Sequence, residues 1–209
     1  PCVRPVHGLC ATAMRICITE RRLDRIRDVL SRRQTDLTLV INNIHDPHNV
    51  SAILRSCDAF GIHRVHLLYT DTAFPALGKK SSGSAKKWVE TVRHKDAASL
   101  AAVLKSQGYT LVATSFSETA RPLSTWDFTG KIAVILGNEH RGVDEDLAPH
   151  VDGALYIPMQ GMVQSLNVSV AAAIILYEGF RQRHAAGCYD TPSLPADELE
   201  RLTQLWAQK

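Results

Sequence analysis

Short, nearly all-apolar segments recur along the chain, and most of them are followed by a segment with helical spacing. Leu37–Ile41 is the clearest, because apolar side chains at almost every position indicate a strand that is buried on both faces. We interpret five segments as strands: Leu37–Ile41, Val65–Tyr69, Thr110–Thr114, Ile132–Leu136 and Ala154–Ile157. Strands that alternate with helices predict an α/β fold, in which helices cover both faces of a parallel sheet.

The helices expected from apolar spacing are Arg21–Arg33, a segment ending at Phe60, Ala97–Gln107, Ser165–Arg183 and Pro195–Trp206. The first and the last of these are expected to be additions to the α/β core. Thr70–Trp88 is rich in glycine, serine and threonine and predicts a mobile surface loop. The expected organisation is a leader of unclear origin at 1–18, a core domain at 19–186 that includes the basic N-terminal helix, and a C-terminal helical extension at 187–209.

The composition favours a reduced, cytoplasmic protein. The chain has five cysteines, and no pair of them has the CxxC spacing of a zinc site, so no metal is expected. No apolar run approaches the ~20 residues of a membrane span. Residues 1–18 lack the continuous apolar centre of a signal peptide, because Pro5, His7 and Gly8 interrupt it.

Basic residues are clustered although the net charge is only +3. The segment Glu20–Arg33 carries six arginines and three acidic residues, and further groups lie at Lys79–Lys87 and Arg181–His184. Separated basic clusters favour a polyanion such as RNA, although solvated helix faces would give the same pattern. The candidate RNA contacts are Arg22, Arg25, Lys87, Arg181 and Arg183.

Three segments at the ends of predicted strands carry the candidate chemistry. The first runs from Asn42 to Gly61. Asn49 or Ser51 is expected to cap its helix. Arg55 lies off the apolar stripe, where it could reach a phosphate near the helix start. A structural alternative is an ion pair between Arg55 and Asp58, three residues further on.

The second and third segments suggest a ligand pocket. Leu136-Gly137-Asn138-Glu139-His140-Arg141-Gly142 is a strand end followed by a glycine turn, but it is neither a GxGxxG nor a phosphate-loop motif. Gly137 fits either the close approach of a ligand or a tight turn. In the third segment, Met159, Met162, Val163 and Leu166 are unusually apolar for a loop, so they favour the wall of a pocket for an adenosyl group. A loop buried in the core or at a subunit interface would explain them equally.

Taken together, the three segments resemble the signature motifs of the SPOUT methyltransferases, and within them the TrmH branch. The likeness rests on Asn49 with Arg55, on Leu136-Gly137-Asn138-Glu139-xx-Gly142, and on Ile157-Pro158-Met159 with Ser165-Leu166-Asn167-Val168-Ser169. It runs from Thr19 to the end of the chain. Each motif alone is weak, whereas three in the same order form a strong signal.

The resemblance implies a trefoil knot in the C-terminal part of the α/β domain, a homodimer, and S-adenosylmethionine bound by the loops of the knot. It implies that Thr114, Gly137, Ile157 and Leu166 line the pocket. It further implies that Arg55 is the catalytic residue, supported by Asn49, Glu139, Ser165 and Asn167. The implied reaction is methylation of the ribose 2′-hydroxyl of guanosine 18 in the D-loop of tRNA.

The residue types suit this chemistry, since methyl transfer needs orientation and a proton acceptor rather than a metal. The resemblance implies that Arg55 itself activates the ribose hydroxyl. A guanidinium keeps its proton in proteins, so the alternative is that Arg55 holds an RNA phosphate and stabilises the developing alkoxide while another group accepts the proton. The alternatives are a ribosomal RNA 2′-O-methyltransferase of the same superfamily, whose members often carry a further N-terminal domain, and a non-catalytic RNA-binding protein. A nicotinamide-dependent oxidoreductase is disfavoured by the missing glycine fingerprint.

Overall fold

The computed structural model describes residues 18–70, 73–75, 85–138 and 142–209. It contains a seven-stranded, all-parallel sheet with the strand order β3-β2-β1-β6-β4-β7-β5. The strands are β1 Leu37–Asn42, β2 Arg64–Leu68, β3 Glu90–His94, β4 Thr110–Thr114, β5 Arg121–Pro122, β6 Ile132–Leu136 and β7 Gly153–Tyr156. The predicted α/β class is therefore confirmed.

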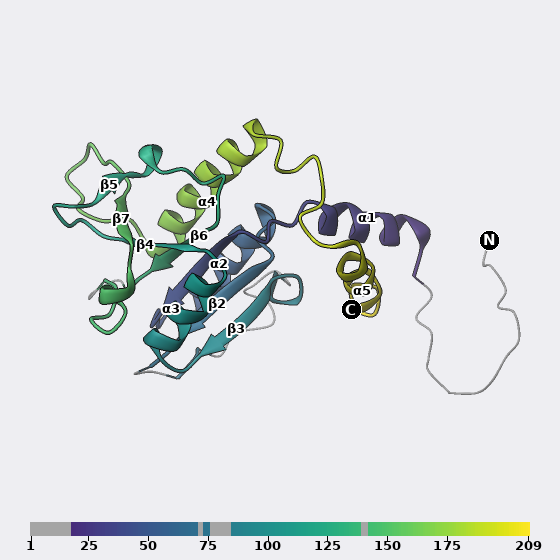
Figure 1. Cartoon of the computed structure of the whole chain (residues 1–209), viewed down its shortest axis with the longest axis horizontal. Coiled ribbons are helices and arrows are strands. Elements are labelled where there is room, and N and C mark those ends of the chain that lie inside the picture. The colour runs from purple at the N-terminus through teal and green to yellow at the C-terminus, as the bar shows by residue number, and fades with distance from the viewer. Residues whose placement is uncertain (1–17, 71–72, 76–84, 139–141) are drawn as a thin grey trace, which may run out of the picture.

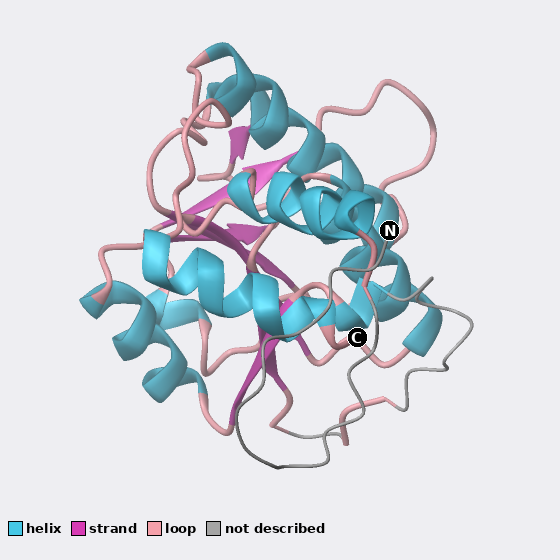
Figure 2. Cartoon of the chain, turned by 90° about the vertical axis from the view of Figure 1, so that its right-hand side faces the viewer, coloured by secondary structure: helices cyan, strands magenta, loops and turns pink. Residues whose placement is uncertain are grey.

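Helices cover both faces of this sheet, as Figures 1 and 2 show. The α-helices are α1 Glu20–Ser31, α2 Pro47–Ala59, α3 Ala97–Ser106, α4 Val168–Ala185 and α5 Ala196–Ala207, and short 3-10 helices lie at Ala85–Lys87, Leu123–Thr125 and Ala148–His150. Side chains of β1 divide between two cores. Leu39 and Ile41 belong to the core that includes residues of α2 and α4, whereas Val40 belongs to the core under α3.

Two strands were missing from the sequence interpretation. β3 reads Glu-Thr-Val-Arg-His, and none of its residues is fully buried, because it lies at the edge of the sheet. β5 has only two residues and pairs with β7 at the opposite edge. Neither strand has the apolar run that identifies a central strand. Most of the expected loop at 70–88 lies outside the described residues.

The first and last α-helices of the chain pack against each other. Ile26 and Leu30 of α1 form a separate core with Leu202 and Trp206 of α5, and Figure 1 shows the two helices side by side at one end of the molecule. Arg33 connects the packed pair of α1 and α5 to α2, because its guanidinium forms an ion pair with Asp58 of α2 and lies over the ring of Trp206 of α5. The domain boundaries expected from the sequence stay predictions.

Candidate active site

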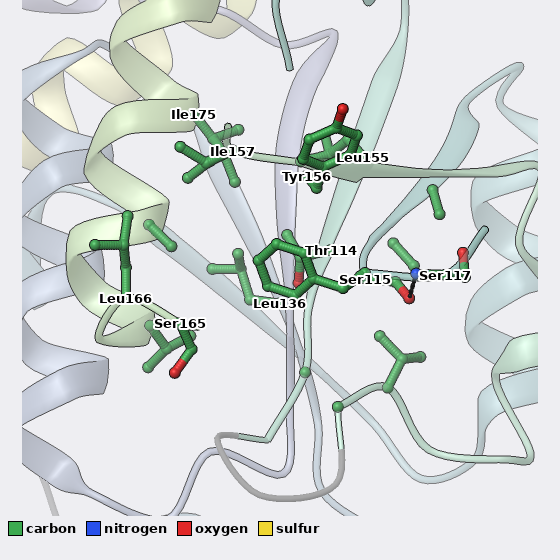
Figure 3. A pocket seen from close by; sticks show the side chains of 18 of the residues that line it. Thr114, Ser115, Ser117, Leu136, Leu155, Tyr156, Ile157, Ser165, Leu166 and Ile175 are labelled. Carbon is green, nitrogen blue, oxygen red and sulfur yellow. Dashed lines mark hydrogen bonds between the residues drawn. The ribbon is translucent and has the colours of Figure 1, made fainter. Parts of the chain in front are cut away.

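A cavity of about 850 Å³ lies at the carboxyl ends of β4, β6 and β7, where parallel sheets bind ligands. One wall comes from the segments that follow these strands, and the other comes from the residues that lead into α4. Figure 3 shows Thr114, Leu136, Tyr156, Ile157, Ser165 and Leu166 around this space. The lining combines aliphatic side chains with hydroxyl and backbone groups, as sites for partly apolar ligands do.

All four residues that were expected to hold a cofactor line this cavity: Thr114, Gly137, Ile157 and Leu166. Ser165 and Asn167 line it as well. The Thr114 hydroxyl donates to the carbonyl oxygen of Ile135 at 3.1 Å, so this side chain also joins β4 to β6. Their role in binding stays a prediction, but the structure brings them together from four separate segments.

Gly137 forms the start of a tight turn. A Cβ at this position would lie 2.2 Å from the carbonyl carbon of Gly142 and 2.5 Å from the nitrogen of Val143. Asn138 and Gly142 exchange two backbone hydrogen bonds, at 2.7 and 2.9 Å, and Gly142 has a φ of 73°. The tight turn alone therefore explains why position 137 is a glycine, and the close approach of a ligand is not needed to explain it. Glu139 lies outside the described residues.

The third motif contributes its residues as a loop rather than as a helix. α4 begins at Val168, not at Ser165, because the Asn167 side chain accepts hydrogen bonds from the Ser169 N–H at 2.9 Å and from its hydroxyl at 2.6 Å. Met159 and Leu166 line the cavity as expected. Met162 and Val163 do not line it, and their exposed fractions are 99% and 63%, so their assignment to the pocket wall was wrong.

A hydrogen bond joins the first motif to the third. The Asn167 amide donates to the Asn49 side-chain oxygen at 3.0 Å. Asn49 is buried. Neither Asn49 nor Ser51 caps α2, contrary to the expectation, because both lie within the helix. The cap is Asp46, whose carboxylate accepts from the His48 N–H at 2.8 Å. Asn49 thus fixes the start of α2 against the entrance of α4.

Arg55 is exposed on α2, six residues beyond Asn49, and it does not line the cavity. The alternative ion pair with Asp58 is absent, because Asp58 pairs with the buried Arg33 instead. Among the described residues, no carboxylate lies within salt-bridge distance of Arg55. The arginine therefore presents its charge to solvent from the same helix that carries Asn49.

The candidate RNA contacts are not equivalent. Arg22 and Lys87 are exposed. Arg25 is exposed but lies 3.4 Å from the Asp28 carboxylate, and Arg181 is exposed but forms two hydrogen bonds with Glu178, at 2.9 and 2.7 Å. Arg183 must be removed from this set. It is fully buried, and its guanidinium is taken up by Gln34, Asp36 and the carbonyl oxygen of Gly130, so it cannot reach a phosphate.

Other residues at the site had no signal in the sequence. Phe116 and Tyr156 line the cavity, with ring centroids 6.2 Å apart. Asp144 accepts hydrogen bonds from Asn42 and Asn43 next to the Gly137 turn. Position directly after a strand could have drawn attention to Phe116 and Asn43, but nothing marks Asp144 within its acidic segment.

The sheet, the cavity and the three motif segments define a class of RNA-modifying proteins. Residues 36–177 match the SpoU rRNA Methylase family, and the chain belongs to this family. A tRNA (guanosine(18)-2′-O)-methyltransferase of Thermus thermophilus is 46% identical over 191 residues, which cover 91% of this chain and 98% of that protein.

Two solved structures extend the comparison. The structure of the Aquifex aeolicus TrmH/SpoU tRNA modifying enzyme superposes with a TM-score of 0.85 at 36% identity, covering 90% of this chain and 96% of that one. The SpoU methyltransferase AviRb from Streptomyces viridochromogenes, in complex with the cofactor AdoMet, gives a TM-score of 0.64 at 28% identity, covering 76% of this chain and 62% of that one.

Two features are absent from the described ranges, a membrane-spanning helix and a cluster of metal ligands. No helix there combines the length and the apolar character needed to cross a bilayer. Within the same residues, no three histidine, cysteine, aspartate or glutamate side chains are grouped as metal ligands would be.

Proposed function

We propose that this protein transfers the methyl group of S-adenosylmethionine to the ribose 2′-hydroxyl of guanosine 18 in tRNA. The observation that carries the proposal is the Asn49–Asn167 hydrogen bond, which joins the helix bearing Arg55 to the rim of the cavity. The near full-length likeness to the Thermus thermophilus enzyme supports the choice of tRNA over ribosomal RNA.

The cavity fits S-adenosylmethionine in size and lining. Its volume of about 850 Å³ lies in the range of about 300–1,000 Å³ that is usual for small-molecule sites. Leu136, Ile157 and Leu166 offer apolar surface to an adenine ring, and the hydroxyl of Ser165 stands at the rim. The AdoMet complex of AviRb, a member of the same superfamily, supports this ligand.

S-adenosylmethionine in this cavity would supply a methyl group on a sulfonium, from which a neutral thioether departs as a good leaving group. The chain has to orient the ribose and assist loss of the hydroxyl proton. Arg55 stays protonated, so its task is to hold the RNA phosphate and stabilise negative charge on the attacking oxygen. The arrangement of Arg55 relative to the reacting ribose is maintained by Asn49, Ser165 and Asn167, together with Glu139 from the second motif. The hydroxyl proton passes to a separate acceptor.

The tRNA is held by exposed basic residues on several elements. Arg22 and Arg25 of α1, Lys87 beside the end of α5, and Arg181 of α4 are the proposed phosphate contacts. Phosphate contacts of this kind position the RNA without reading its sequence. Binding to Arg181 requires the RNA to compete with Glu178.

The proposal includes two further properties that the family resemblance implies for this protein, a trefoil knot and a homodimer. The strand order supports the knot, since β6 lies between β1 and β4 in the sheet. The dimer is supported by exposed apolar side chains on α4, where Val170 is 46% and Tyr177 56% exposed. These residues are seven positions apart and therefore share one face of the helix.

The proposal is tested by single-turnover transfer of a labelled methyl group to unmodified tRNA transcripts, with the modified nucleotide mapped. The wild-type chain should modify guanosine 18. Arg55→Ala should lower the rate at saturating tRNA by about 100-fold or more, with a much smaller loss of tRNA affinity. An unchanged saturated rate would show that Arg55 has no part in the chemistry.

Arg22→Ala is the matched control for charge. It should weaken tRNA binding and reduce the slope of log K against log salt by about one unit at most, while the saturated rate stays near that of the wild type. Methylation of ribosomal RNA without methylation of tRNA would show that ribosomal RNA, not tRNA, is the substrate. Binding of tRNA without any transfer would favour a non-catalytic protein.

A further inference from the structure

A cluster of polar side chains, three of them buried, lies next to the cavity where β1 and β6 end. It consists of Asn42, Asn43, Asn138 and Asp144. The side chains of Asn42 and Asn43 are completely buried, and Asn138 is 7% exposed. Burial of three amides is costly unless each is hydrogen-bonded, so their partners are informative.

Asp144 is the centre of this group. Its Oδ2 accepts hydrogen bonds from the Nδ2 atoms of Asn42, at 2.8 Å, and of Asn43, at 2.5 Å. Its backbone N–H donates to Oδ1 of Asn42 at 3.0 Å. Asp144 therefore forms three hydrogen bonds with the last residue of β1 and the residue after it, although it lies more than 100 positions away along the chain.

Asn43 holds a second set of contacts. Its Nδ2 donates to the Thr70 hydroxyl at 3.0 Å, and its Oδ1 accepts from the Thr70 N–H at 3.2 Å. Its carbonyl oxygen accepts from the Asn138 amide at 2.9 Å. Among the described residues, Asn43 is the only one other than glycine with a positive φ, 47°, a conformation that asparagine tolerates better than most residues.

These contacts link both walls of the cavity. Gly137, Asn138, Gly142 and Val143 line one wall, and Asn138 and Asp144 fasten that wall to Asn42 and Asn43. The same two asparagines lead into α2, where Asn49 is hydrogen-bonded to Asn167 of the other wall. The distance between the walls thus depends on the contacts of Asn43 and Asp144.

We propose that Asn43 and Asp144 are positioning residues, which hold the wall at Gly137 and Val143 in the shape that binds S-adenosylmethionine. The inference rests on the proposed function for the identity of the ligand. Neither side chain lines the cavity, so both act through the backbone of the wall. Loss of the Asp144 carboxylate leaves two buried amides without their acceptor, and the wall shifts to restore hydrogen bonding.

The test is titration calorimetry with S-adenosylmethionine, together with steady-state kinetics on tRNA. Asp144→Ala should weaken binding and raise the KM for S-adenosylmethionine by on the order of 10-fold, with kcat changed far less. Asp144→Asn should restore most of the affinity, because an amide oxygen can accept the same two hydrogen bonds. Asp146→Ala is the matched control, since Asp146 is an exposed acid two positions away and should bind like the wild type.

A second variant covers the case in which Asp144→Ala does not fold. Asn43→Gly keeps the positive φ but removes the amide, and it should weaken binding to a similar extent. The double variant should be no weaker than the worse single variant, because the two residues act through one contact. Fully additive losses, or an Asp144→Asn that binds as weakly as Asp144→Ala, would overturn the proposal.

The outcome is separable from that of the proposed function. If the wild-type chain binds no S-adenosylmethionine, the proposed function fails and the positioning role fails with it. If the wild type binds and both single variants bind equally well, only the positioning role is overturned. A lower unfolding temperature with unchanged affinity would assign Asn43 and Asp144 to stability alone, which also overturns it.

Discussion

Position 137 has room for a hydrogen atom and for nothing larger. An added methyl group would contact the carbonyl of Gly142 and the nitrogen of Val143. Both are backbone atoms, so no change of side-chain rotamer can relieve the clash. We expect Gly137→Ala to open the turn, to lower stability by about 1–3 kcal/mol, and to weaken S-adenosylmethionine binding by at least about 10-fold. Chemical unfolding and calorimetry measure both effects.

Gly161→Ala is the matched substitution, because a Cβ at Gly161 meets no atom within 4 Å. It should leave both stability and affinity close to the wild type. Equal behaviour of the two alanine variants would mean that the turn at Gly137 is not part of the binding wall.

Single residues were predictable from the sequence where a motif marks them, and not where burial depends on distant partners. Thr114, Gly137, Ile157 and Leu166 do meet at one cavity. Arg33 and Arg183 were assigned to basic surface clusters, because arginine is rarely buried. Their burial depends on Asp58 and Asp36, which are far from them in sequence and could not be paired with them in advance.

At the level of elements, the central strands followed from the sequence and the edge strands did not. β1 and β6 are buried on both faces, which gives them uninterrupted apolar runs. β3 needs no such run, because only one of its edges is paired. The start of α4 was also misplaced, since the capping role of Asn167 depends on its contact with Ser169.

The pairing of β2 with β3 gives the molecule a specific response to pH. His66 of β2 and His94 of β3 lie two register positions apart, and their Nδ1 and Nε2 atoms are 2.9 Å apart. Burial, together with the proximity of His94 and Arg64, lowers the pKa of His66 to about 4. The unfolded chain therefore takes up a proton first, and stability falls as the pH drops from the ordinary histidine pKa of 6.5 towards 4.

We expect the free energy of unfolding to decrease by about 2 kcal/mol between pH 7 and 4.5 from this histidine. His66→Gln should reduce that slope without removing it, because the pKa of His63 is also lowered by burial. Urea unfolding at several pH values measures the slope of the unfolding free energy against pH. Parallel curves for the wild type and His66→Gln would contradict the assignment.

On the scale of the whole molecule, the exposed side of α4 is the feature that favours a second copy. Val170 and Tyr177 share one face, and an apolar face of this kind is seldom left to solvent. We expect light scattering after gel filtration to give twice the chain mass of 23.1 kDa at micromolar concentration. Tyr177→Glu combined with Val170→Glu should shift the mass towards that of the single chain.

Val103→Glu provides the comparison, since Val103 is 39% exposed on α3 and lies on a different element. It should leave the mass unchanged. A wild-type mass near 23.1 kDa would remove the dimer from the proposal, and a dimer that survives both charges on α4 would place the interface elsewhere.

The packing of α1 against α5 also orders events during synthesis. The buried apolar partners of Ile26 and Leu30 are Leu194, Leu202 and Trp206, which all lie near the C-terminal helix α5. A chain emerging from the ribosome would therefore carry an arginine-rich helix with an uncovered apolar side until α5 has also emerged. During that interval α1 would be open to chaperones and to the nearby ribosomal RNA, and the docking of α5 would be the step that covers it.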